Sequence, residues 1–427
     1  MSRPVRVNPV GRIAHAWSLE GGPLAPFANG QYRLFSIAAL ISGTALSAQA
    51  LTRVWLVQQQ THSPFMVALV AAATAIPLLL LGFVGGFLSD RFDRRRITLF
   101  VEAASSIAAA VLAALVVMGV ASTWYLIFFS LLHGSAAALS NSAKQTLLAD
   151  LVPARQQRGA IGLSMVVGNL AGIAGPAIAG LLITVFSTSH AMVAGAALAF
   201  AALPFYALVR ADPPRTRAVA GRVFQSLGEG IRFVIKDPSL RWLLLVGAAL
   251  LITLSSRGAV YPALVQDVLG GGAGALGMLE LVGSLGAVFG PLVAIWLASR
   301  FPDRRVTIAA GFAFAASVVV LALSQSFYMA LAMSAVSSFT GTIFFVTNLT
   351  AFQLSAPDEF RGRVVSVRFV SWGLQPAGTL SLGALAEVLG PQVALLCFAV
   401  GGGLLFAFLI LIARPARPDR VVALRAA

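Results

Sequence analysis

Long apolar stretches alternate with short polar connections along almost the whole chain. Each stretch is about twenty residues or longer and nearly free of charge, which is the length that an α-helix needs to cross about 30 Å of hydrocarbon. Most connections are short, so neighbouring helices are expected to be antiparallel. The pattern predicts an all-α integral membrane protein with twelve transmembrane helices, at residues 34–57, 65–88, 97–119, 123–145, 160–186, 190–209, 242–265, 274–298, 306–324, 327–350, 364–387 and 391–413.

The low content of charged residues excludes an ordinary soluble domain. Only 11% of the 427 residues are charged, against about 25% in an average soluble chain, and 58% are hydrophobic. The single cysteine, Cys397, lies inside an apolar stretch, so the chain cannot form an internal disulfide. The first thirty residues lack an apolar core, and we interpret them as a cytoplasmic arm rather than a signal peptide.

The basic residues lie on one side of the predicted membrane. Of the 30 Lys and Arg, 28 lie in the N-terminal segment, in the C-terminal tail, or at every second connection between helices. This distribution follows the positive-inside rule and predicts that both termini are cytoplasmic. The net charge of +15 therefore suits anionic lipid headgroups as partners rather than nucleic acid.

One long basic connection divides the chain into two halves. Residues 210–241 contain two consecutive prolines and seven Lys or Arg, with six apolar stretches before them and six after. A weak internal repeat supports two related halves, because Arg91-Phe92 is echoed by Arg300-Phe301. We predict a cytoplasmic N-terminal arm (1–31), an N-terminal six-helix bundle (32–210), a cytoplasmic linker (211–241), a C-terminal six-helix bundle (242–413) and a cytoplasmic tail (414–427).

The connection between the second and third apolar stretches has a distinctive spacing, Gly86-x-Leu88-x-Asp90-Arg91-x-x-Arg94-Arg95. It resembles the loop motif of the major facilitator superfamily of secondary transporters, with Asp93 in place of the usual glycine. This variant is similar to the enterobactin-exporter-like and macrolide-efflux-like branch, the transmembrane secretion effectors. The resemblance covers nearly the whole chain and implies two six-helix bundles that act on a small-molecule substrate. The alternative is that the arginines only fix the topology.

The resemblance also implies roles for three charged residues near this loop. In the family, the aspartate that corresponds to Asp90 faces the N-terminus of helix 11 across the joint between the halves. The arginine that corresponds to Arg94 pairs with an acidic residue below helix 4, here Asp150. We interpret these groups as a latch that holds the cytoplasmic face shut and breaks when the halves move. The alternative is a static salt bridge that only holds the loop.

Small residues form one face on each of two predicted helices. Such faces let helix backbones approach closely in a membrane, where lipid offers no hydrophobic drive between helices. The Gly-Pro step of helix 5 resembles the antiporter motif of drug exporters, and the alternative is general small-residue packing. We predict that helices 5 and 8 pack together across the joint, through Gly168, Gly172, Gly175 and Pro176 on helix 5 and Gly283, Gly286 and Gly290 on helix 8.

Several ionisable residues inside the predicted helices are candidates for the transport pathway, because charge is costly in hydrocarbon and usually faces a cavity or a partner. Arg53 and Arg257 are predicted to present positive charge to an outward-facing vestibule, which suits an anionic or catecholate-like substrate. For Arg53 the alternative is snorkelling to the outer headgroups. Glu280 is either the proton-coupling acid or the partner of Arg257, and His133 is either a proton carrier or a packing residue. Glu102 is expected near the cytoplasmic headgroups or paired with a loop arginine.

These features predict a secondary active exporter of a small, partly lipophilic compound, such as a siderophore or a drug, that works by alternating access. Exchange for protons is expected, with the proton gradient as the energy source and no cofactor. Drug exporters often carry an arginine in helix 4 where this chain has Ser130, so their proton-coupling arrangement cannot be transferred. The sequence contains no zinc-type cluster, nucleophile triad or phosphate-binding loop, so an enzyme is not expected.

The cellular setting and two rival functions complete the prediction. We place the protein as a monomer in a bacterial inner membrane, in contact with lipids. A lysolipid flippase or an uptake carrier of the same fold is the first alternative, because a fold does not determine direction or substrate. A membrane sensor or scaffold without transport is the second.

Overall fold

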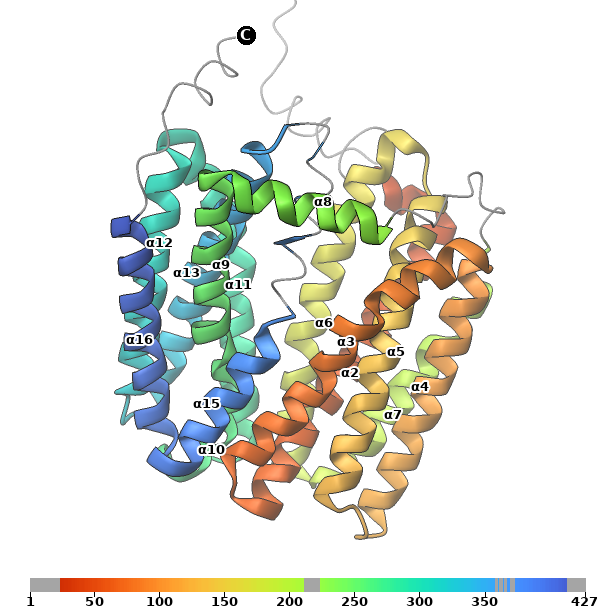
Figure 1. Ribbon diagram of the computed structural model, residues 1–427. Helices are drawn as coiled ribbons and strands as arrows, with labels where there is room; N and C mark the ends of the chain where they lie inside the picture. Colours follow the sequence, from red (N-terminus) through yellow and green to blue (C-terminus); the bar gives the residue numbers. More distant parts are fainter. Residues whose placement is uncertain are drawn as a thin grey trace, which may run out of the picture.

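The computed structural model describes residues 24–210, 223–357, 360, 364, 367–368 and 373–412, and every element within them is helical (Figure 1). Eleven helices within these residues are long and apolar enough to cross a membrane. The predicted all-α membrane architecture is therefore confirmed. The predicted span at 364–387 lies partly outside the described residues, so the count of twelve stays a prediction.

The first half of the chain begins with the short helix η1 (Ala25–Ala28). The long helices that follow are α2 (Gly30–Thr61), α3 (Pro64–Arg91), α4 (Arg94–Val117), α5 (Thr123–Asp150), α6 (Gln157–Val185) and α7 (Thr188–Leu208), with the one-turn η2 (Ala154–Gln156) before α6.

The second half contains more short elements. Its first helices are α8 (Val223–Lys236), α9 (Pro238–Leu254), η4 (Ser255–Ala259), α10 (Tyr261–Ala263) and η5 (Leu264–Val268). They are followed by α11 (Ala273–Arg300), α12 (Asp303–Ala322), α13 (Phe327–Leu354), α15 (Gln375–Leu389) and α16 (Pro391–Ile412).

Tight turns between the helices are built by capping residues. His62 ends α2 in a left-handed conformation with φ of 49°, and Ser63 then caps α3 by accepting a hydrogen bond from the backbone N–H of Met66. At the other end of α3, Asp93 caps α4 by accepting from the backbone N–H groups of Arg95 and Arg96. These caps satisfy helix ends that would otherwise carry unpaired polar groups at the membrane surface.

Helices α2 to α7 pack on one another through small residues. α2 packs on α6 and α7, α3 on α5, and α4 on α5 and α7. Gly134 of α5 lies so close to α3 that a Cβ added there would be 2.2 Å from the carbonyl oxygen of Thr74. Gly175 of α6 likewise faces Ser47 and Ala48 of α2. These close approaches replace the hydrophobic effect as the source of packing energy in lipid.

The second group of helices packs around aromatic rings. α11 and α12 pack on α13, and α16 packs on α9 and α12. Phe314, Phe344 and Phe406 are buried where these helices meet, with the rings of Phe344 and Phe406 5.9 Å apart in an edge-on arrangement. Gly311 lies against the ring of Phe406, so any larger residue there would displace it.

The glycine faces of predicted helices 5 and 8, which are α6 and α11 in the structure, pack differently from the prediction. α6 and α11 do contact each other, but through Pro176, Gly180 and Gly277, where an added Cβ on Gly180 would lie 3.0 Å from the Cα of Gly277. The expected partners are wrong for the other glycines, and Gly175 faces α2 instead of α11. On α11, Gly283, Gly286 and Gly290 face α13 instead, while a Cβ at Gly168 or Gly172 would meet no atom within 4 Å.

The seventh predicted helix, 242–265, is not continuous. It starts earlier, at Pro238, ends at Leu254 and continues as three short elements of 3-10, α and π geometry. Pro262 lacks the N–H that a regular helix would use, and Gly258 weakens the preceding turn. The structure also contains a helix that the sequence reading missed, α8, inside the predicted linker.

The two ends of the molecule differ in charge. We call one the basic end, because the turns that carry Arg91, Arg96, Arg300 and Arg305 and the helix α8 lie there (Figure 1). The opposite end contains the turns α2–α3 and α15–α16 and the short helix α10.

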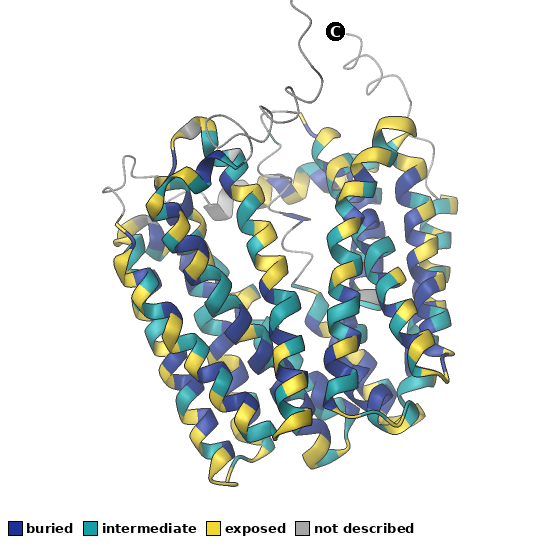
Figure 2. Ribbon diagram, turned by 180° about the vertical axis from the view of Figure 1, so that it is seen from behind, coloured by how far each residue is buried: buried dark blue, intermediate teal, exposed yellow. Residues whose placement is uncertain are grey.

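Exposed residues lie along the outside of the helices (Figure 2), and many of them are large and apolar. Phe100, Leu181 and Leu411 are 76%, 63% and 84% exposed. Trp124 and Tyr328 are exposed at the opposite end, where amphipathic rings suit a membrane–water interface. An exposed apolar surface of this kind fits lipid contact on all sides.

Candidate functional site

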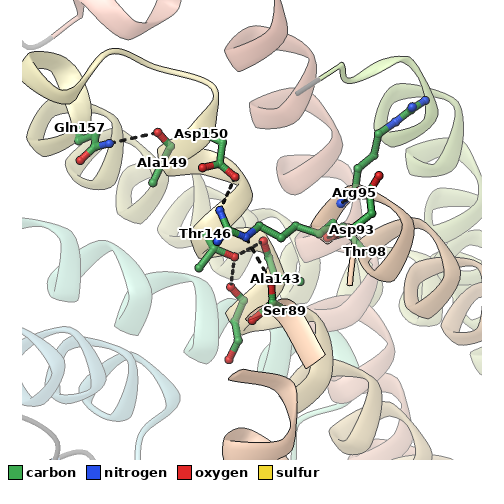
Figure 3. Close-up of polar contacts among 11 residues, drawn as sticks. Ser89, Asp93, Arg95, Thr98, Ala143, Thr146, Ala149, Asp150 and Gln157 are labelled. Carbon is green, nitrogen blue, oxygen red and sulfur yellow. Dashed lines mark hydrogen bonds and ion pairs between the residues drawn. The ribbon is translucent and has the colours of Figure 1, made fainter. Parts of the chain in front are cut away.

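The loop motif between α3 and α4 contacts two neighbouring helices, and Figure 3 shows the contact with Asp150 of α5. Arg94 forms an ion pair with Asp150 at the end of α5 and donates from Nε to the carbonyl oxygen of Ser89 at 3.3 Å. Arg95 donates from Nη2 to the carbonyl oxygen of Ala207 on α7. The turn at the basic end is thus held against α5 and α7 together.

The remaining loop residues contribute less to the described contacts. Arg91 is exposed, and a Cβ added at Gly86 would meet no atom within 4 Å. The side chain of Asp90 and most of the segment before α15 lie outside the described residues. The predicted contact between Asp90 and the start of helix 11 therefore stays a prediction.

Arg53 is buried in α2, where its side chain is only 1% exposed. None of its three guanidinium nitrogens has a hydrogen-bond partner among the described residues, and the nearby ionisable side chain is His133 of α5. The alternative that Arg53 snorkels to the outer headgroups is wrong, because the side chain is buried, whereas the predicted outward-facing vestibule stays a prediction, since the outer end is closed in this structure. The Arg53 side chain is enclosed by the surrounding helices and is absent from the walls of the two cavities described next.

The C-terminal half contains an open cavity of about 300 Å³ between α11, α12, α13 and the broken seventh helix, with polar and apolar residues in its walls. Arg257 donates from Nε to the Tyr261 hydroxyl at 2.8 Å and from Nη2 to the Ser338 hydroxyl at 2.9 Å, and its guanidinium lies 5.4 Å from the centre of the Phe314 ring. Glu280 lines the same cavity. The walls are completed by Gly258, Ala287, Ser337, Gly341, Thr342 and Phe345.

This cavity combines a fixed cation with aromatic walls. The 3-10 turn η4 directs Arg257 toward α13, and the hydroxyl groups of Tyr261 and Ser338 hold its guanidinium in place. A guanidinium binds carboxylates and other paired oxygens well. Glu280, predicted as the proton-coupling acid or as the partner of Arg257, lines the same cavity as Arg257, and both roles stay predictions.

The N-terminal half contains a second polar cavity, of about 170 Å³, between α2, α4, α5 and α7. Glu102 of α4 forms an ion pair with Lys144 of α5 at 2.8 Å, and His133 lines the same cavity. The expected pairing of Glu102 with a loop arginine is wrong, because its partner is Lys144 of α5, and its expected position near the cytoplasmic headgroups stays a prediction. Glu102 and Lys144 each lie about two turns from the basic end, on neighbouring antiparallel helices. Their equal distance from that end is the sequence feature from which the pairing could have been predicted.

The opposite end is closed by contacts between the two halves. Glu387 of α15 accepts hydrogen bonds from the Ser63 hydroxyl at 2.7 Å and from the backbone N–H of Phe65 at 3.2 Å, at the N-terminus of α3. Gly383 packs beside Ala68 one turn further along the same pair of helices. The carboxylate therefore occupies a helix N-terminus, where the helix dipole favours negative charge.

A weaker polar contact lies beside this one. Gln58 donates from Nε2 to Asp267 Oδ2 at 3.5 Å, the outer limit of a hydrogen bond. Burial raises the pKa of Asp267 above its ordinary value, and the nearby His62 partly opposes this. The closed arrangement thus binds a proton at Asp267 more readily than a hydrated carboxylate would.

We expect acid to favour closure of the opposite end through Asp267. Because the pKa of Asp267 is raised when this end is closed, the closed state gains stability as pH falls through that pKa and loses it as pH rises. The change is measured as the pH dependence of the distance between spin labels placed at the opposite end on the two halves. Asp267→Asn should remove this contribution, and an unchanged pH response in that variant would contradict the assignment.

Comparisons with known proteins agree on one type of molecule. A family model described as transmembrane secretion effector matches residues 21–422. The chain is 26% identical over 384 residues to the multidrug efflux pump Tap of Mycolicibacterium fortuitum, across 87% of this chain and 93% of that protein. It is 24% identical over 387 residues to the enterobactin exporter EntS of Shigella flexneri, across 89% of each.

The fold has solved counterparts at lower sequence similarity. The nucleoside transporter NupG superposes with a TM-score of 0.72 at 13% identity, covering 90% of this chain and 98% of that structure. At this identity the likeness concerns the fold alone.

Proposed function

Because the chain belongs to the transmembrane secretion effector family of the major facilitator superfamily, we propose that it exports a small, partly lipophilic compound from the cytoplasm in exchange for protons. The relatives named as a multidrug efflux pump and an enterobactin exporter support the direction. The proton gradient is then the source of energy, and the protein works as a monomer in a bacterial inner membrane.

The observation that carries this proposal is the cavity around Arg257. A fixed guanidinium, a carboxylate and two phenylalanine rings line one cavity inside the hydrocarbon region, where charge is retained mainly for function. The cation suits an acidic or catecholate group, and Phe314 and Phe345 suit a flat apolar ring. We assign this cavity to the substrate.

Alternating access follows from the contacts between the halves. The positive-inside rule assigns the basic end to the cytoplasm, so the opposite end faces outward. Contacts of Glu387 with α3 and of Gly180 with Gly277 join the halves at that outer end. Gly168, in the cytoplasmic half of α6, and Gly172, at the middle of that helix, have open space beside them. This arrangement supports a state closed to the outside, from which the halves rock to release substrate.

The function is tested in inside-out membrane vesicles with an acidic interior and a pH-sensitive dye. Enterobactin, a macrolide and a lipophilic cation are added in turn. We expect one of these classes to collapse the proton gradient in part, because each substrate molecule that enters a vesicle is exchanged for protons that leave it. Vesicles without the protein are the control. No response to any class from demonstrably folded protein would contradict proton-coupled export, and movement of a fluorescent lysolipid in the same vesicles would instead favour a flippase.

A further inference from the structure

The ion pair between Glu102 and Lys144 joins two membrane-spanning helices, α4 and α5, inside the bundle. Its side chains are 15% and 21% exposed, about as enclosed as those of Arg94 and Asp150 at the turn of the basic end, which are 15% and 24% exposed. An enclosed pair of charges is a poor source of stability, because desolvation offsets most of the attraction. Ionisable residues within membrane-spanning helices commonly mark a functional site.

The cavity beside the pair has the properties of a hydrated polar site. Its volume of about 170 Å³ is enough for several waters at roughly 30 Å³ each. Gln49 and His133 line it and are only 2% and 3% exposed, yet Gln49 Oε1 and His133 Nε2 have no hydrogen-bond partner among the described residues. Buried polar atoms of this kind usually bind water or a ligand. They indicate a path for water to the Glu102 carboxylate.

Every helix packed around the pair contributes to its environment. Lys144 of α5 also lies 5.4 Å from the centre of the Tyr206 ring of α7, and the Tyr206 hydroxyl lies 3.1 Å from Ser42 of α2. His133 is the third ionisable residue of the cavity lining, and Arg53 lies near His133. Lys144 therefore has a second partner, Tyr206, besides Glu102.

We propose that Glu102, paired with Lys144, is the residue that binds and releases the exchanged proton, in the N-terminal half and apart from the substrate cavity. The inference rests on the proposed function, since it names the acid of that exchange. A proton from water adds to a carboxylate oxygen of Glu102 and later returns to water from the same oxygen. Protonation ends the ion pair between α4 and α5, next to α2.

The helix α2 links this site to the outer end. Ser42 and Gln49 of α2 line the cavity, and Gln58 of the same helix contacts Asp267 of the other half. A change of charge at Glu102 can thus alter the position of α2 and bias the contacts that close the outer end. Coupling then arises through one rigid helix that both sites contact.

The test does not require a known substrate. Spin labels are placed at Val120→Cys and Val393→Cys, on opposite halves at the outer end, in a chain with Cys397→Ser and Asp267→Asn. The distance distribution is measured across pH in lipid nanodiscs. We expect the distance distribution of this reference chain to shift with pH. In Glu102→Gln the shift should be lost, and the distribution should stay near its low-pH form. In Glu280→Gln the shift should be retained.

A purely structural pair is distinguished by a double variant. If Glu102 and Lys144 only stabilise the bundle, the neutral combination of Glu102→Gln and Lys144→Gln should restore both the yield of folded protein and the pH response. If Glu102 carries the proton, the double variant restores folding but not the response. A pH shift that persists in Glu102→Gln would overturn the assignment of Glu102 but not the proposed proton exchange. A reference chain without any pH shift would also overturn the assignment of Glu102, whereas proton exchange itself is decided by the vesicle assay.

Discussion

Replacing Arg257 by glutamine is expected to abolish export while the protein still inserts and folds. The guanidinium is held by the hydroxyl groups of Tyr261 and Ser338 in the cavity that also contains Glu280. The change removes the cation for the substrate and leaves the carboxylate of Glu280 without its neighbouring positive charge. A hydrogen bond between the guanidinium and a charged group of the substrate is worth about 1.5–3 kcal/mol. If the transition state for transport loses this amount, transport slows by roughly 10- to 150-fold.

The measurement is substrate-dependent collapse of the proton gradient in vesicles, scaled to the amount of folded protein. Arg257→Lys is the matched control, because it keeps the charge but not the forked geometry that holds two hydroxyl groups, and it should retain partial activity. The combination of Arg257→Gln with Glu280→Gln should fold well and still fail to export. Export at the normal rate by Arg257→Gln would show that the substrate binds elsewhere.

Replacing Glu387 by alanine is expected to open the outer end. Its carboxylate accepts hydrogen bonds from Ser63 and from the backbone N–H of Phe65, at the N-terminus of a helix from the other half. Hydrogen bonds to a charged group together with the helix dipole are worth about 1–2 kcal/mol at an exposed position. Such a loss changes the ratio of closed to open molecules by roughly 5- to 30-fold.

Spin-label distances between Val120→Cys and Val393→Cys in the Cys397→Ser chain measure this ratio. Glu387→Gln keeps the length and the acceptor oxygen but loses the charge, so it should lie between the native chain and the alanine variant. Glu387→Asp keeps the charge but is too short to reach both donors, and it should resemble alanine. Equal distance distributions in all four chains would mean that other contacts hold the outer end shut.

The membrane architecture and the family could both be predicted from the sequence. Charged residues are rare and their placement alternates between connections, which is a local property that needs no tertiary contact to be recognised. The predicted family is confirmed by the match over residues 21–422 and by relatives that are transporters. The caps at Ser63 and Asp93 explain why the helices end close to where hydropathy placed them.

The partners of individual side chains were predicted less well. A glycine spacing shows that one face of a helix is smooth, yet it does not show which neighbour lies on that face. Gly283 and Gly286 therefore face α13 rather than helix 5, and Gly180 makes the contact between the halves instead. The snorkelling alternative for Arg53 is wrong because its side chain is buried, and hydropathy shows the depth of a residue in the membrane but not its direction around the helix axis.

The sequence alone determined that this chain spans the membrane many times, which end is basic, and which family it belongs to. These conclusions depend on composition and on motifs that are continuous along the chain. The tertiary structure decided the break of the seventh helix at Arg257, the pairing of Glu102 with Lys144, and the contact of Glu387 with the start of α3. Each of these depends on how helices distant in sequence are rotated and packed against one another, and the energies of such packing are set by all of the neighbours together.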